Sequence, residues 1–63
     1  MISIQRANIN SALKRMETAQ KRGDKAGFYM ARDSLSVTLK AIENVDNATY
    51  GEFAKYMTQD YKA

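Results

Sequence analysis

The segment from about residue 25 to 45 constrains the fold most, because its apolar residues fall on two separate helical stripes. At roughly 100° per residue, the two stripes lie about 140° apart around a helix axis. A helix that is apolar over so wide an arc needs neighbours on two sides. We therefore expect this segment to be the central helix of an all-α fold. The first stripe consists of Phe28, Ala31, Leu35, Leu39 and Ile42, and the second of Met30, Val37 and Ala41.

Residues 4–22 form a helical pattern with signals at both ends. Ser3 is a suitable N-cap, and Gly23 can adopt the left-handed conformation that ends a helix. Asp24 follows directly and can cap the next helix, so a short turn and an antiparallel hairpin are favoured over one continuous helix through Gly23 and Gly27. The apolar positions of the first helix are Ile9, Ala12, Leu13, Met16 and Ala19.

Residues 44–48 predict a turn, because Asn and Asp compete with helical backbone hydrogen bonds. Thr49 and Glu52 have the spacing of a capping box, with Ala48 and Phe53 as its hydrophobic staple, so a third helix is expected over about 50–61. The sequence thus predicts a single all-α domain over residues 1–63, a small three-helix bundle made of a helical hairpin plus a shorter third helix. The apolar face expected for the third helix is Tyr50, Phe53, Ala54, Met57 and Tyr61.

A chain of 63 residues is near the lower size limit at which one core can offset chain entropy. The absence of cysteine excludes disulfides and thiolate metal sites as extra support. Self-association remains as a source of stability. The stripe of Met30, Val37 and Ala41 could receive the third helix. If the third helix packs on the stripe that begins at Phe28 instead, the second stripe is left exposed and becomes the seam of an oligomer. We expect self-association of this kind, because Ser34 and Ala41 are small enough for two helices to approach closely.

The chain lacks the side chains that most catalytic sites use. It has no histidine, and its seven carboxylates form no close pair that matches a metal-binding loop or a glycosidase-like dyad. No glycine-rich nucleotide motif is present. We expect a protein that is not an enzyme, with no cofactor and no metal. The sequence also shows no apolar run for a membrane span and no signal peptide, which favours the cytoplasm.

Positive charge is concentrated in the first 32 residues, which contain seven basic and two acidic residues and carry a net charge of +5. The remainder carries −2. Five of the seven basic residues form a ridge on the outer side of the first helix and the turn after it. This basic ridge could bind phosphates of DNA, RNA or a nucleotide, or it could be an ordinary solvated helix face. The third segment is near-neutral and lacks base-reading arginine, so a helix-turn-helix is not indicated. The ridge consists of Lys14, Arg15, Lys21, Arg22 and Lys25.

Tyr29 and Tyr56 lie off the apolar stripes and are candidate interface residues, since tyrosine is enriched in binding surfaces. The alternatives are ordinary exposed side chains or rings that stack on nucleic-acid bases. The leading hypothesis is a non-enzymatic helical interaction protein, a small accessory regulator of the phage type. It would bind and modulate or inhibit a larger protein with an acidic surface, as a homo-oligomer. The alternatives are phosphate-directed nucleic-acid binding through the first helix, and sequestration of an anionic nucleotide between subunits.

Overall fold

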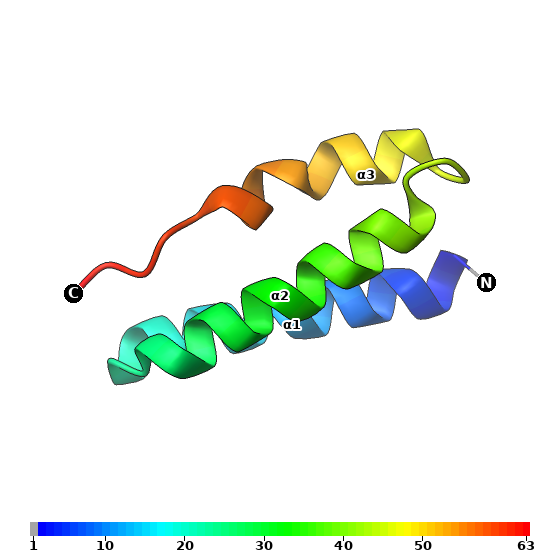
Figure 1. Cartoon of the computed structure of the whole chain (residues 1–63). Coiled ribbons are helices and arrows are strands. Elements are labelled where there is room, and N and C mark those ends of the chain that lie inside the picture. Colours follow the sequence, from blue (N-terminus) through cyan, green and yellow to red (C-terminus); the bar gives the residue numbers. More distant parts are fainter. Residues whose placement is uncertain (1) are drawn as a thin grey trace.

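The computed structural model describes residues 2–63, with side chains from residue 3 onward, and this part of the chain is helical with no strand. α1 and α2 lie antiparallel, and the C-terminal segment, residues 47–63, returns along α2 (Figure 1). The predicted all-α fold of a hairpin plus a shorter third helix is confirmed. The elements are α1 (Ile2–Arg22), α2 (Lys25–Ile42), α3 (Asn47–Phe53) and a short 3-10 helix, η1 (Ala54–Thr58).

The turn between α1 and α2 follows from two adjacent residues. Gly23 has a φ of 71°, the left-handed conformation that glycine adopts without steric strain. The Asp24 amide then donates to the Ala19 carbonyl at 2.8 Å, which satisfies a carbonyl at the end of α1. The Asp24 carboxylate accepts from the Gly27 amide at 2.9 Å and caps α2. The predicted hairpin is therefore confirmed, with both signals acting as expected.

The core lies between α1 and α2. All five residues of the first α2 stripe are buried, and four of the five apolar α1 positions are buried with them. Leu13, the fifth, is half-buried against the same cluster. Leu35 and Leu39 are completely inaccessible, and burying each stabilises the fold by about 1.5–3 kcal/mol. α2 also contacts α3 and η1, which confirms it as the central helix.

Two predicted helix ends are wrong. α1 begins at Ile2, so Ser3 is an exposed residue inside the helix and not its N-cap. α2 ends at Ile42 and not near residue 45. The chain turns there because the amides of Val45 and Asp46 both bond to the Ile42 carbonyl, at 3.1 and 2.8 Å.

The predicted start of the third helix is also wrong. The N-cap is Asp46, whose carboxylate accepts from the Thr49 amide at 3.1 Å. Thr49 is buried inside the first turn of α3, and its hydroxyl donates to Asp46 and accepts from Arg6 of α1 at 3.2 Å. A charged acceptor three residues earlier thus replaces the expected capping box, and exposed Ala48 forms no staple.

The third helix ends earlier than predicted. α3 covers Asn47–Phe53, η1 tightens the chain over Ala54–Thr58, and the tail of residues 59–63 is extended. The tail leaves the helix because side chains of the hairpin bind its backbone. Tyr61 therefore packs on the core from an extended segment and not from a helical face.

Candidate functional site

The basic ridge is intact and exposed in the structure. Lys14, Arg15, Lys21 and Arg22 project from the face of α1 opposite its buried stripe, and Lys25 is the first residue of α2. Lys21 makes an exposed ion pair with Glu17, with the Lys21 Nζ 3.7 Å from a carboxylate oxygen. Glu17 is the one acidic residue of α1 and pairs with one cation, so the ridge keeps an excess of positive charge.

The second α2 stripe is also exposed. Met30 and Val37 keep 72% and 64% of their surface in contact with solvent, and Ala41 is exposed beside them. Val45, in the turn that follows α2, is 65% exposed. The structure therefore brings Met30, Val37 and Ala41 together on one outer face of α2, which α1 and the C-terminal segment leave uncovered. We call this face the α2 stripe.

The two candidate tyrosines do not join the α2 stripe. Tyr29 is half-buried, with its ring edge-on to Phe28 at 5.3 Å between ring centroids. Its hydroxyl accepts from the Tyr61 amide at 3.2 Å, and the Arg32 guanidinium lies 4.6 Å from its ring centroid. Tyr56 is half-buried against the core from η1. Both tyrosines contribute to contacts within the chain.

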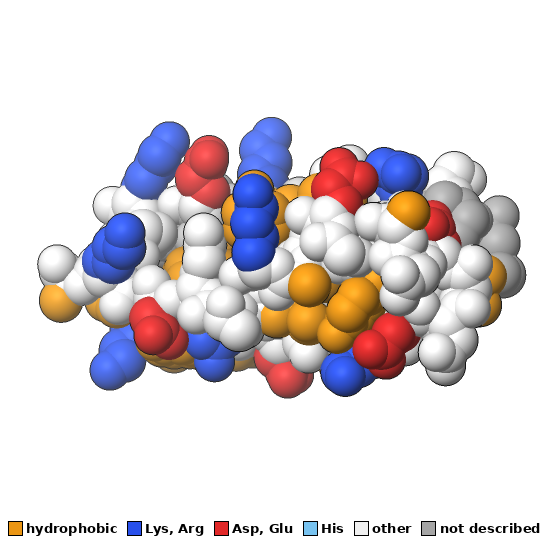
Figure 2. Space-filling model, turned by 90° about the horizontal axis from the view of Figure 1, so that it is seen from above, with side chains coloured by type: hydrophobic (Ala, Val, Ile, Leu, Met, Phe, Trp, Pro, Cys, Tyr) orange, Lys and Arg blue, Asp and Glu red, His pale blue; other side chains and the backbone are white. Residues whose placement is uncertain are grey.

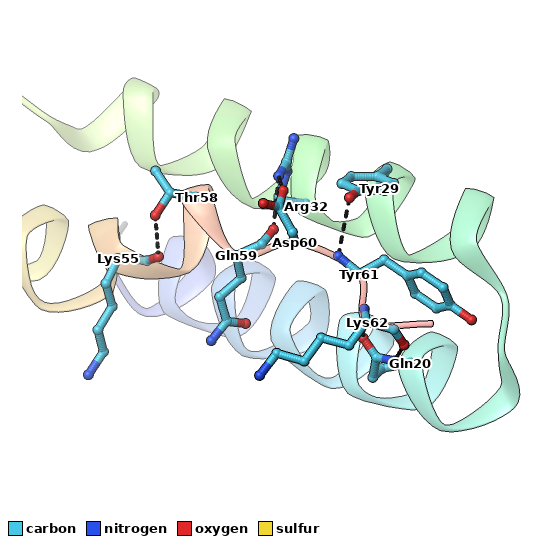
Figure 3. Close-up of polar contacts among 9 residues, drawn as sticks. All are labelled: Gln20, Tyr29, Arg32, Lys55, Thr58, Gln59, Asp60, Tyr61 and Lys62. Carbon is cyan, nitrogen blue, oxygen red and sulfur yellow. Dashed lines mark hydrogen bonds and ion pairs between the residues drawn. The ribbon is translucent and has the colours of Figure 1, made fainter.

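The tail runs along the turn end of the hairpin and is held there by a set of polar contacts (Figure 3). Arg32 donates to the Gln59 carbonyl at 2.8 Å and to the Asp60 carboxylate at 3.2 Å. The Gln20 side chain accepts from the Lys62 amide at 2.9 Å and donates to the Lys62 carbonyl. These bonds satisfy backbone groups that a continued helix would have paired internally.

The tail and η1 form a groove of about 690 Å³ with α1 and α2. Its apolar floor combines Leu13 and Met16 with Phe28 and Tyr56. Seen from the α3 side, hydrophobic side chains reach the surface in the middle, among basic and acidic side chains (Figure 2). The sequence interpretation missed this groove because it extended the third helix over the residues that bridge it. The polar lining residues are Glu17, Gln20, Gln59, Asp60 and Lys62.

One carboxyl group has a clearly shifted pKa. Hydrogen bonds from the Thr49 hydroxyl and amide hold the pKa of Asp46 below its ordinary value, and the positive charge of Arg6 acts in the same direction. This shift belongs to the cap of α3, and the carboxyl group has a structural role there.

No group of histidine, cysteine or carboxylate side chains within residues 2–63 is arranged to hold a metal ion. None of the helices in this part of the chain combines the length and apolar character that a bilayer crossing requires. Comparisons with models of protein families, with curated proteins and with solved structures found no match to this chain. The arguments for function therefore depend on the basic ridge, the α2 stripe and the groove.

Proposed function

We propose that this chain is a non-enzymatic helical interaction protein that pairs with a second copy through α2 and, as a dimer, binds and modulates a larger protein. The observation that carries the proposal is the exposed α2 stripe. Met30 and Val37 expose most of their surface, although they lie on the central helix of a chain so short that its core provides little stability. Pairing two copies would remove these side chains from water and add stability.

The charges beside the stripe favour an antiparallel pair. Asp33 and Lys40 lie on the same flank of α2, seven residues apart, with Val37 between them along the helix. In a two-fold antiparallel pair, each flank meets the same flank of its partner, so residue i contacts j and j contacts i. A two-fold axis near Val37 would place Asp33 of each copy beside Lys40 of the other. Lys40 also pairs with Glu43 at 3.8 Å within its own chain, an exposed contact that is easily rearranged.

A dimer of this kind leaves the groove and the basic ridge exposed. The groove has the apolar floor and polar rim that are typical of contacts with another protein. The absence of histidine and cysteine from the chain supports a function by contact and not by catalysis. We therefore propose that a larger partner protein binds the dimer on the side of the groove.

Sedimentation equilibrium tests the pairing. Val37→Asp is expected to shift the chain to a monomer while preserving helicity, because it places a charge at the centre of the proposed interface. Ile4→Asp is the matched control, since Ile4 is 65% exposed on α1 and away from the α2 stripe. A wild-type chain that stays monomeric at high concentration would overturn the proposal.

The antiparallel geometry has its own test. Asp33→Lys would place like charges together at both ends of the pair and is expected to weaken the dimer about 3- to 10-fold. The double variant with Asp33→Lys and Lys40→Asp should restore the wild-type dissociation constant, because opposite charges meet again. Failure of the double variant to restore pairing would contradict this arrangement of the two helices.

A further inference from the structure

The outer face of α1 has a regular arrangement of charge that a solvated face does not require. At roughly 100° per residue, Lys14 and Lys21 fall in one row along the helix, and Arg15 and Arg22 fall in a second row about 100° away. The two members of each row are seven residues apart, or about 10 Å along the axis. Exposed small residues lie on the midline between the rows, namely Ala7, Ser11 and Thr18.

No carboxylate lies on this face. Glu17, the single acidic residue of α1, is on the flank beside Lys21 and pairs with it. The C-terminal segment approaches α1 along that same flank, through Arg6 and the side chain of Gln20. The midline and both rows therefore remain open along a helix of 21 residues. Such a helix is about 30 Å long.

We propose that the outer face of α1 binds in the major groove of double-stranded DNA. The major groove of B-form DNA is about 12 Å wide and accepts a single α-helix. Small residues on the midline let the helix approach the floor of the groove. The two cationic rows then point toward the phosphates of the two opposite walls, so all four charges are used at once. A monomer and a dimer present the same face, so this inference does not depend on pairing through α2.

The arrangement favours DNA over the other anionic partners. Double-stranded RNA has a deep, narrow major groove that excludes a helix. An acidic protein surface, the partner expected from the sequence, could be bound equally well by one row of cations, so it does not explain the second row. Because Ser11 and Thr18 are the midline hydrogen-bonding groups, most contacts would be with phosphates and sequence selectivity would be low.

Fluorescence anisotropy with a labelled DNA duplex tests the proposal. Binding of the wild type is expected to weaken about a hundredfold between about 50 and about 200 mM NaCl. The reason is that each of the four phosphate contacts contributes about 0.9 to the slope of log K against log salt. Absence of binding at the lower salt concentration would overturn the inference. Equal affinity for double-stranded RNA, for poly-glutamate or for anionic lipid vesicles would also overturn it, since none of these has a groove that accepts the helix.

Variants of the two rows test insertion between the walls. Replacing Lys14 and Lys21 with Gln is expected to lower the salt slope by about two, and replacing Arg15 and Arg22 with Gln should do the same. The matched control changes Lys55 and Lys62 to Gln, which removes the same charge elsewhere and should leave the slope unchanged. A lower salt slope in only one of the two row variants would overturn groove binding.

A neutral variant separates groove insertion from charge attraction. Thr18→Trp places a large side chain on the midline without changing the charge, and it should lower the affinity for duplex DNA at least tenfold. Circular dichroism is expected to show that the variant is folded, because Thr18 is exposed. Unchanged affinity in Thr18→Trp would overturn docking in the groove. Val37→Asp lies on α2, so the test of pairing succeeds or fails separately.

Discussion

The α1–α2 hairpin and the C-terminal segment are stabilised by different kinds of contact. Every buried apolar side chain among the described residues lies on α1 or α2. The C-terminal segment contributes one fully buried residue, Thr49, and otherwise half-buried side chains and hydrogen bonds. The hairpin therefore carries most of the free energy of folding, and the C-terminal segment is held to it by contacts that can open separately.

The largest effect is expected from the hairpin core. Leu35→Ala should lower the free energy of unfolding by about 3 kcal/mol, because it removes a completely buried side chain and leaves a cavity. A domain of this size has about 3–9 kcal/mol in total, so the variant should lose between a third and all of its stability. Urea denaturation followed by circular dichroism measures the change.

Met57→Ala is the matched variant in the C-terminal segment. Met57 is half-buried against the core from η1, so its truncation should lower stability by only about 1 kcal/mol. Equal losses in the two variants would show that η1 contributes as much to stability as the hairpin core, and the distinction between the two regions would be wrong.

This difference explains which parts of the fold were predictable. The hairpin follows from periodic apolar residues and from Gly23 and Asp24, all of which act within a few residues of the chain. The end of the third helix depends on bonds from Arg32 and Gln20 to residues 27 and 42 positions later. No local sequence pattern near Gln59 indicates those partners, so the helical periodicity predicted a third helix that is too long.

An intermediate effect is expected at the contact between Thr49 and α1. Thr49→Ala removes the hydroxyl that donates to Asp46 and accepts from Arg6, and should lower the free energy of unfolding by about 1 kcal/mol. Thr49→Ser keeps the hydroxyl and is the control, with a smaller loss from the missing methyl group. An unchanged melting temperature in Thr49→Ala would mean that this contact does not couple α3 to the hairpin.

The same contact predicts a dependence on pH. The pKa of Asp46 in the folded chain lies below the ordinary value of 3.8, so its ionised form stabilises the fold. That contribution is fully present above the unfolded pKa and is lost as the pH falls through the lower, folded pKa. The melting temperature of the wild type should therefore fall on acidification below about pH 4. Asp46→Asn should show a flatter profile over the same range, and an identical slope would contradict the assignment.

The candidate surfaces were predictable to different degrees for the same reason. The basic ridge and the α2 stripe are each made by one helix, so helical spacing alone grouped their residues. The groove is made by α1 and α2 together with η1 and the tail, and its floor includes Tyr56, which the sequence placed at an interface. A surface built from three separated segments requires their packing to be known.

The smallest effect is expected in the tail, where a single hydroxyl can be removed. The Tyr61 amide donates to the Tyr29 hydroxyl, and the Lys62 amide donates to the Gln20 side chain. Tyr29→Phe keeps the ring against Phe28 and should change global stability by only a few tenths of a kcal/mol, because the bond lies near the surface. Amide hydrogen exchange should nevertheless become faster at Tyr61.

Gln20→Ala is the companion variant, expected to speed exchange at the Lys62 amide. If each substitution affects only its own amide, the tail is bound by separate bonds and opens residue by residue. If Tyr29→Phe speeds exchange at both amides, the tail opens as one unit while the hairpin stays closed. Faster exchange in the core amides of Leu35 and Leu39 would contradict both outcomes, because it would show that the tail and the hairpin unfold together.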